Sequence, residues 1–331
     1  MKLSFLDLTT TDPDYNLAVE QYVFDCLPKD RAYIMLWQND NAIIIGKHQN
    51  TLAEINDNYV RQNNIRVVRR LSGGGAVYHD LGNLNFTFIS DAGDEDSLNF
   101  QLYCQPIIQT LASLGVTAKL NGRNDITIDD KKFSGNAQYM RNGRVMHHGT
   151  IMFNSNLEIL TNALKADPTK VQSKGIKSIR SRVTNVYDHL ATDITLEQFR
   201  SILLNNIISK NDSSPYIFSE EELAAIREIQ RTRYSQWDWN YGYSPACTIY
   251  KHRRFEGCGT VEIYLSVDNG HITNADFRGD FFSAEEPDAL AQRLIGCRPE
   301  PEDYYAALAN IDAGRYFNGL STKELLDLFC E

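Results

Sequence analysis

The sequence predicts a two-domain protein of the α+β class, and three observations support this prediction. Its 331 residues are long for one domain and sufficient for two. Strand-like apolar runs, such as Ala32–Trp37, are interleaved with segments that suit a helix, such as residues 102–114. An aromatic strip at residues 234–245 marks a change in composition, which we take as the boundary. We therefore expect a large domain over residues 1–244 and a small accessory domain over 245–331.

The composition is that of a soluble globular protein, with 42% hydrophobic and 23% charged residues. A net charge of −10 argues against non-specific nucleic-acid binding, so we expect no nucleic-acid partner. The six cysteines lack the paired short spacing of a zinc site or a redox motif. Without a leader sequence or an apolar run near 18 residues, we expect a cytoplasmic protein that does not enter a membrane.

The N-terminal region predicts a strand, a helix and a hairpin. Residues 2–8 alternate enough to form a short strand. A helix with one apolar face is expected to begin at Asp12 and to stop at Pro28. The apolar runs 32–37 and 42–45 are separated by four turn-forming residues, which predicts a β-hairpin with a buried face.

Residues 69–86 contain the most distinctive motif. Two arginines and a serine precede three consecutive glycines, and an alternating apolar segment with a His-Asp pair follows. Glycine permits positive φ and a close approach to a ligand, while Arg69 and Arg70 supply donors for phosphate or carboxylate. On the glycines alone, a flexible turn remains the simpler interpretation. The order strand, loop, strand excludes a dinucleotide-binding fold, which needs a helix after the glycines.

Residues 121–153 form a second polar stretch between strand-like segments. Two consecutive aspartates predict a turn, and Lys132 follows it, by default as a solvated lysine. His147 and His148 precede an apolar run. Because neighbouring residues on a strand point to opposite faces, and no third ligand stands at a suitable spacing, we expect no zinc site here.

Residues 165–182 reverse the local charge, with six basic residues against one aspartate. Serines and a glycine interrupt this run, which favours a mobile basic loop able to close on an anion. Two helices should follow, because Thr195 with Gln198 and Ser219 with Glu222 have the spacing of a capping box.

The segment after residue 245 is predicted to form a small α+β unit. Residues 259–267 alternate, Asp268-Asn269-Gly270 is a strong hairpin signal, and residues 271–277 return as the partner strand. Two helices are expected near residues 287–295 and 322–329.

Five motifs occur in a defined order along the chain. They are Arg70-x-Ser72-Gly73-Gly74-Gly75-Ala76-Val77-x-His79-Asp80-x-Gly82-Asn83, Gly122-Arg123-Asn124-Asp125, Lys132-x-Ser134-Gly135, His147-His148-Gly149-Thr150, and Lys174-Gly175 with residues 178–185. In order and spacing the combination resembles the lipoate-protein ligase family of the biotin/lipoate ligase superfamily, over essentially the whole chain. This resemblance implies a large catalytic domain with mixed β-sheets flanked by helices, and a small α+β accessory domain.

The resemblance also implies a two-step reaction. Lipoate and ATP would form lipoyl-adenylate and pyrophosphate, after which a lysine of an acceptor domain would attack the mixed anhydride. The implied acceptors are the lipoyl domains of 2-oxoacid dehydrogenase complexes and the glycine-cleavage H protein. The implied cofactors are ATP and Mg²⁺, with lipoate as the small-molecule substrate.

Site residues follow from the same resemblance. Lys132 matches the catalytic lysine, which would bridge the lipoate carboxyl and the α-phosphate and offset their charge. Arg70 would contact lipoate or the phosphates. Asp125 would hold magnesium through oxygen, with a plain turn carboxylate as the alternative. The other implied substrate- and ATP-binding residues are Ser72, Gly73, Gly74, Gly75, Ala76, Val77, Tyr78, His79, Asn83, Ser134, Gly135 and His148, of which the two histidines also suit a purely structural role.

Three other functions agree less well with the sequence. An octanoyl or lipoyl transferase on the same scaffold would use a cysteine nucleophile, yet residues 105–246 contain no cysteine. A non-catalytic adenylate- or lipoyl-domain-binding module would not need Lys132, Arg70 or the basic segment. A biotin ligase would require its own arginine-rich glycine loop, which the sequence lacks.

Overall fold

The computed structural model divides the chain into two compact units. It describes residues 2–91, 99–122, 124–164, 182–243, 247–279, 281 and 285–331. The first unit comprises residues 1–49, 54–56 and 62–236, and the second comprises 50–53, 57–61 and 237–331. The expected boundary between residues 244 and 245 lies outside the described residues, so it stays a prediction.

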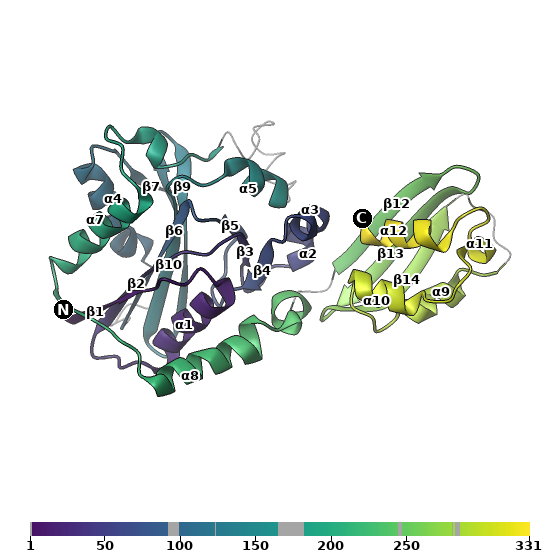
Figure 1. Ribbon diagram of the computed structural model, residues 1–331, viewed down its shortest axis with the longest axis horizontal. Helices are drawn as coiled ribbons and strands as arrows, with labels where there is room; N and C mark the ends of the chain where they lie inside the picture. The colour runs from purple at the N-terminus through teal and green to yellow at the C-terminus, as the bar shows by residue number, and fades with distance from the viewer. Residues whose placement is uncertain are drawn as a thin grey trace. The chain divides into compact units, whose positions relative to one another are not determined.

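The first unit is built on an eight-stranded mixed sheet in the order β11-β1-β2-β6-β10-β9-β8-β7 (Figure 1). Its strands are β1 (Lys2–Asp7), β2 (Ala32–Trp37), β6 (Asn83–Asp91), β7 (Lys119–Asn121), β8 (Asp125–Ile128), β9 (Lys131–Arg141), β10 (Arg144–Met152) and β11 (Asp212–Pro215). β1 runs parallel to β2 and β11, and the other pairs are antiparallel. A separate three-stranded sheet joins β3 (Ala42–Ile45), β4 (Arg66–Arg69) and β5 (Val77–His79).

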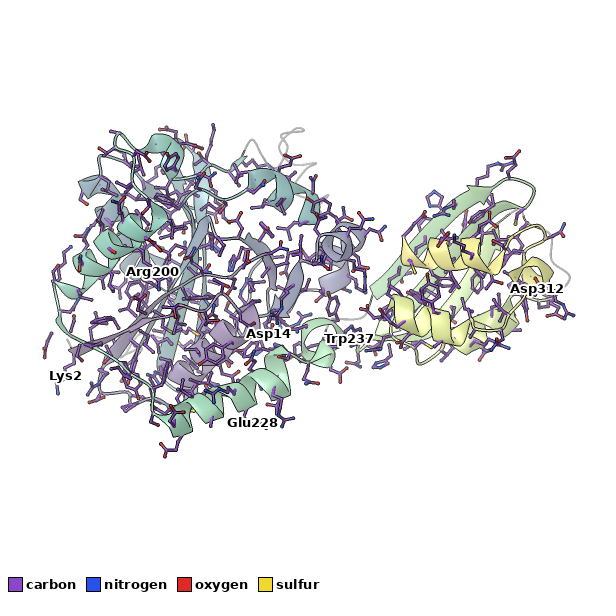
Figure 2. The ribbon with its side chains drawn as sticks, in the orientation of Figure 1. Lys2, Asp14, Arg200, Glu228, Trp237 and Asp312 are labelled. Atoms are coloured by element: carbon purple, nitrogen blue, oxygen red, sulfur yellow. The ribbon has the colours of Figure 1, made fainter. Side chains whose placement is uncertain are left out.

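Helices cover both faces of the large sheet. The helical segments before the second unit's strands are α1 (Pro13–Cys26), α2 (Thr51–Glu54), α3 (Asp57–Gln62), α4 (Phe100–Ser113), α5 (Leu157–Ala163), η2 (Tyr187–His189), α7 (Leu196–Ile208), α8 (Glu220–Ile229), η3 (Gln230–Tyr234) and η4 (Asp238–Gly242). On one face, α4 and α7 bury apolar side chains against strand residues such as Phe86. Arg200 of α7 (Figure 2) also donates to the carbonyl oxygens of Leu8 and Leu36. On the other face, α1 reaches β6 through Glu20, which accepts a hydrogen bond from Thr87.

The predicted helix starts are confirmed. Asp12 caps α1 by accepting from the Asp14 amide, and Pro13 is the first helical residue. Both predicted capping boxes are present, at the starts of α7 and α8. The predicted turn at two aspartates is also present, because Asp129 and Asp130 have φ angles of 49° and 61°.

The predicted hairpin of residues 32–37 and 42–45 is wrong. β2 pairs with β1 and β6 in the large sheet, whereas β3 pairs with β4 and β5 in the small one. β2 has a neighbour on each edge, so it has no edge left for β3. The connection is held instead by Asn16, whose side chain donates to the Gln38 carbonyl oxygen at 2.8 Å and to Asn39 Oδ1 at 3.0 Å.

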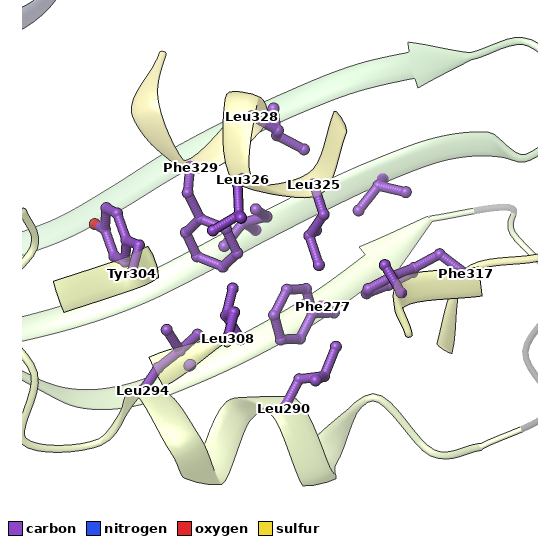
Figure 3. Packing of buried hydrophobic residues seen from close by; sticks show 14 of the residues in the cluster. Phe277, Leu290, Leu294, Tyr304, Leu308, Phe317, Leu325, Leu326, Leu328 and Phe329 are labelled. Carbon is purple, nitrogen blue, oxygen red and sulfur yellow. The ribbon is translucent and has the colours of Figure 1, made fainter. Parts of the chain in front are cut away.

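The second unit contains an antiparallel sheet with helices packed on it (Figure 3). Besides η4 and most of α2 and α3, its elements are β12 (Cys247–Phe255), β13 (Gly259–Asp268), β14 (His271–Gly279), α9 (Asp288–Leu294), α10 (Pro301–Ala307), α11 (Ala313–Tyr316) and α12 (Thr322–Cys330). Phe277 of β14 packs on Phe317 and on Phe329 of α12, with ring centroids 5.4 Å and 6.1 Å apart. The predicted hairpin is confirmed, with Asn269 and Gly270 at positive φ in its turn. The two predicted helices are α9 and α12, and the sequence did not indicate α10 or α11.

Among the helices that the structure describes, none has the length and apolar character needed to cross a bilayer.

Candidate active site

The glycine-rich segment forms the loop between β4 and β5. Gly74 has a φ of 93°, in the left-handed region that favours glycine. The loop lies directly against the turn after β3, because a Cβ on Gly46 would be 2.0 Å from the Gly74 carbonyl oxygen. The amide of Lys47 donates to the carbonyl oxygen of Ser72 at 2.8 Å. These contacts fix the backbone of the glycine loop.

The buried side chain of Arg70 stabilises the same loop through hydrogen bonds. Its guanidinium donates to four acceptors: the carbonyl oxygens of Ile44 (3.0 Å), Gly73 (2.7 Å) and Gly75 (2.9 Å), and Ser72 Oγ (3.0 Å). Burial lowers the pKa of Arg70 to about 10, so it remains a cation at neutral pH. The structure therefore assigns this arginine a part in shaping the loop, and its direct contact with a ligand stays a prediction.

A chain of buried hydrogen bonds runs from Ser72 to α1. Ser72 Oγ lies 2.6 Å from His148 Nε2, and His148 Nδ1 lies 2.8 Å from Glu20 Oε1. Thr87 Oγ1 donates to the same carboxylate oxygen at 2.7 Å, and Trp37 Nε1 donates to Thr87 Oγ1 at 3.0 Å. Since a carboxylate only accepts, His148 Nδ1 is the donor to Glu20. We call these five residues and Arg70 the Glu20 network.

His79 lies at the end of β5 and is 3% exposed. Burial, with smaller effects from Arg70 and His148, lowers the pKa of His79 to about 3, so its ring is neutral. Asn39 Nδ2 donates to His79 Nδ1 at 3.2 Å, which places the ring proton on Nε2. Among the described residues, no partner accepts from this buried Nε2.

Lys132 and Asp125 form an ion pair between β9 and β8. Lys132 Nζ lies 2.7 Å from Asp125 Oδ1, and both side chains are slightly more than a third exposed. The lysine side chain passes directly over Gly135, where a Cβ would be 2.8 Å from Nζ and 2.9 Å from Cε. The amide of Thr184 donates to the Lys132 carbonyl oxygen at 2.9 Å. Glycine at position 135 therefore leaves the space that this lysine occupies.

These features meet at one cavity of about 580 Å³, part of which is open to solvent. Its lining combines apolar walls with a few polar groups. The lining residues are Leu17, Trp37, Ile44, Arg70, Gly74, Gly75, Ala76, Val77, His79, Asn85, Asn124, Lys132, Gly135, Asn136, Ala137, His148, Gly149 and Thr150.

Known proteins with similar sequences account for both parts of the chain. Residues 12–208 match the family model of the lipoyl protein ligase A/B catalytic domain, and residues 244–329 match that of the bacterial lipoate protein ligase C-terminus. The chain is 43% identical over 320 residues to the lipoate-protein ligase LplJ of Bacillus subtilis, with 96% of each chain covered.

The chain belongs to the lipoate-protein ligase family. The predictions of family, fold class and enzyme class are thereby confirmed. Two solved structures agree with this membership. The bipartite lipoate protein ligase from Thermoplasma acidophilum, described with its E2 lipoyl domain, matches with a TM-score of 0.65 at 30% identity, covering 73% of this chain and 97% of that one. A lipoate-protein ligase A bound with ATP matches with a TM-score of 0.63 at 27% identity, covering 73% and 100%.

Most of the site residues predicted for this ligase reach the cavity. Those that line it are Arg70, Gly74, Gly75, Ala76, Val77, His79, Lys132, Gly135 and His148. Those that do not are Ser72, Gly73, Tyr78, Asn83, Asp125 and Ser134. Of these, Tyr78 donates its hydroxyl to Asn41 Oδ1 at 3.1 Å, and Asn83 donates to Asn85 Oδ1 at 2.8 Å. Arg123 and the basic segment at 165–181, including Lys174 and Gly175, lie outside the described residues.

Sequence reasoning about this ligase missed several cavity residues. Leu17 lies within the helix expected between Asp12 and Pro28, and Trp37 and Ile44 lie in apolar runs expected to be strands, where apolar residues are ordinary core residues. Glu20 offered a clearer signal, because a carboxylate within the apolar helix sequence Leu-Ala-Val-Glu is buried only when it is paired.

Proposed function

We propose that the chain activates free lipoate with ATP to lipoyl-adenylate and then transfers the lipoyl group to a lysine of an acceptor lipoyl domain. The observation that carries this proposal is the position of Lys132, a cation that lines the same largely apolar cavity as Gly74 and Gly75 of the glycine loop. The apolar cavity suits the aliphatic part of an acid, and the cation suits a carboxylate that reacts with a phosphate.

In the first step, a carboxylate oxygen of lipoate attacks the α-phosphorus of ATP, and the bond to pyrophosphate breaks. Two anions approach each other, so a fixed positive charge lowers the barrier. Lys132 supplies that charge beside the reacting carboxylate. In the second step, the acceptor amine attacks the acyl carbon and AMP leaves, while Lys132 stabilises the oxyanion of the tetrahedral intermediate.

The aliphatic chain of lipoate would lie along the apolar walls of the cavity. Leu17, Trp37 and Val77 contribute side chains there, and Ala137 does so from β9. Each buried methylene is worth about 0.8 kcal/mol, so this contact favours a medium-chain acid over a short one.

We propose that Asp125 contributes to Mg²⁺ binding. The described residues contain no cluster of three metal-ligating side chains, which excludes an all-protein cage within them. Mg²⁺ bound with a nucleotide needs only one or two carboxylates, because phosphates and water supply the other oxygens. Asp125 fits that requirement, and the bound ion would neutralise part of the phosphate charge.

The alternative of a cysteine-dependent acyl transferase is not supported by the structure. Among the described residues, no cysteine lines the cavity. Cys104 lies on α4, on the opposite face of the large sheet, and burial raises the pKa of its thiol to about 12. Such a thiol is not ionised at neutral pH and is a poor nucleophile.

As acceptors we propose the lipoyl domains of 2-oxoacid dehydrogenase complexes and the glycine-cleavage H protein. The related ligase from Thermoplasma acidophilum was described with its E2 lipoyl domain, which supports the first of these. Lipoylation of each purified acceptor, compared with the same domain lacking its target lysine, tests this assignment.

The central test is ATP-pyrophosphate exchange with lipoate, octanoate and biotin in turn. We expect exchange with lipoate, and its complete loss in Lys132→Ala without loss of the folded state. Lys131→Ala is the matched control, because Lys131 is the exposed neighbour on the same strand. Near-normal exchange by the Lys132 variant, or no exchange by the wild-type protein, would overturn the proposal.

A further inference from the structure

Asn136 of β9 fastens the start of β8 to the strand that carries Lys132. Its side chain is 4% exposed, and Nδ2 donates to the Asn124 carbonyl oxygen at 3.1 Å and to Ser134 Oγ at 3.2 Å. The backbone amide of Asn136 donates to the same Asn124 oxygen at 2.9 Å. Asn124 Nδ2 returns a bond to the Asn136 carbonyl oxygen at 2.7 Å. Three hydrogen bonds therefore join these two asparagines.

His147 of β10 sets the orientation of that asparagine. Gln138 Nε2 donates to His147 Nδ1 at 2.9 Å, so the ring proton is on Nε2. His147 Nε2 lies 3.2 Å from Asn136 Oδ1 and donates to it. An amide whose oxygen accepts from His147 must turn its NH₂ group toward Asn124. The histidine thus selects the amide orientation in which Asn136 bonds to Asn124. We call the three hydrogen bonds between Asn136 and Asn124 the clamp.

The space around this contact is closely filled. The His147 ring is stacked between Phe86 and Tyr103, with centroid separations of 5.8 Å and 5.0 Å. A Cβ on Gly149 would lie 2.2 Å from Asn136 Oδ1 and 2.6 Å from Phe86 Cζ. Glycine at this position in the His-His-Gly-Thr motif therefore makes room for the Asn136 amide, and any other residue would displace it.

Asn124 directly precedes Asp125, the ion-pair partner of Lys132. We propose that Asn136, oriented by His147, is a positioning residue that sets the Lys132–Asp125 pair for adenylate formation. Asn136 and Asn124 both line the cavity, but the side-chain amide of Asn136 is taken up by His147 and by the Asn124 carbonyl oxygen. Asn136 therefore acts on Asp125 through the Asn124 backbone. This inference rests on the proposed role of Lys132.

Two variants test the clamp. Asn136→Asp keeps the shape of the side chain but replaces the donor facing the Asn124 carbonyl oxygen by a carboxylate oxygen, which repels it. His147→Phe keeps the aromatic stack and removes only the hydrogen bonds. Asn142→Asp is the matched control, because it makes the same chemical change at an exposed turn of the β9–β10 hairpin.

In lipoate-dependent exchange, we expect kcat to fall between tenfold and a hundredfold in Asn136→Asp and between threefold and tenfold in His147→Phe. An ångström of misplacement at catalytic groups has effects of this size. KM for lipoate should change less than threefold, because the apolar walls of the cavity are unaltered. A general loss of folding would not lower kcat while leaving KM unchanged. Asn142→Asp should match the wild type.

Crystal structures of the variants supply a readout that does not depend on activity. We expect the distance between Lys132 Nζ and Asp125 Oδ1 to exceed 4 Å in Asn136→Asp. An intact pair, together with wild-type kcat in both variants, would overturn the inference. If the wild-type protein shows no exchange, the proposed function fails, and the crystallographic distance still decides whether Asn136 positions the pair.

Discussion

Replacing Glu20 by glutamine removes the negative charge from the Glu20 network without changing its shape. Glu20 is 2% exposed, and its Oε1 accepts from both His148 and Thr87. Its charge also opposes the effect of burial on Arg70. The structure therefore predicts that this carboxylate stabilises both the fold and the glycine loop that Arg70 holds.

The magnitude follows from the hydrogen bonds that change. Glutamine can still accept from both donors, but each bond loses its ionised acceptor. Hydrogen bonds to charged groups contribute about 1.5–3 kcal/mol, against about 0.5–1.5 kcal/mol for neutral ones, so two bonds lose about 2 kcal/mol. Glu20→Ala leaves both donors without this acceptor and removes the charge that opposes the effect of burial on Arg70, which should cost about 3–5 kcal/mol.

Urea unfolding at pH 7 measures these losses, and pyrophosphate exchange measures their effect on the site. Glu256→Gln is the control, because this glutamate is exposed in a turn of the second unit and should change stability by less than about 0.5 kcal/mol. If Glu20→Gln were as stable as that control and equally active, the carboxylate would not support the loop, and our reading of the network would be refuted.

Three further predictions concern the site and its surroundings. Gly135→Ala should lower exchange about a hundredfold, because the added methyl group would lie 2.8 Å from Lys132 Nζ, while a thermal melt should change little; an unchanged rate would contradict the need for this space. Burial lowers the pKa of His79 and of His147 to about 3, so the unfolded chain binds protons that the folded chain does not between pH 6.5 and 3. Stability should therefore fall as the pH drops through that range, and His147→Phe should remove one of the two contributions from the measured slope. Cys104→Ala should retain exchange, and a thiol reagent at pH 8 should modify the exposed Cys26 well before Cys104; loss of activity would revive the transferase alternative.

Local signals in the sequence predicted the elements whose physical cause is also local. Asp12 and Pro13 mark the start of α1 because a side-chain oxygen and a missing amide suit the first turn of a helix. Asn269 and Gly270 mark the β13–β14 turn because both residues tolerate positive φ. The alternation of a strand likewise predicted that His147 and His148 point to opposite faces.

Local sequence signals could not predict strand partners or buried polar networks. The turn-forming residues between β2 and β3 are compatible with a hairpin, and only β1 and β6 on either side of β2 exclude it. The Glu20 network joins residues that are up to 128 positions apart, as in the bond between Glu20 and His148. No pattern within a short window distinguishes such a paired carboxylate from one that faces solvent.

The two adjacent histidines show how one strand serves the site from both sides of the sheet. His148 lies on the cavity side, where it connects Ser72 of the glycine loop to Glu20. His147 lies on the α4 side, where it orients Asn136. The first holds the loop proposed to enclose the adenylate, and the second holds the strand end beside Lys132. Because β10 carries both, the glycine loop and the lysine are fixed relative to one another by a single strand, as a reaction between two bound substrates requires.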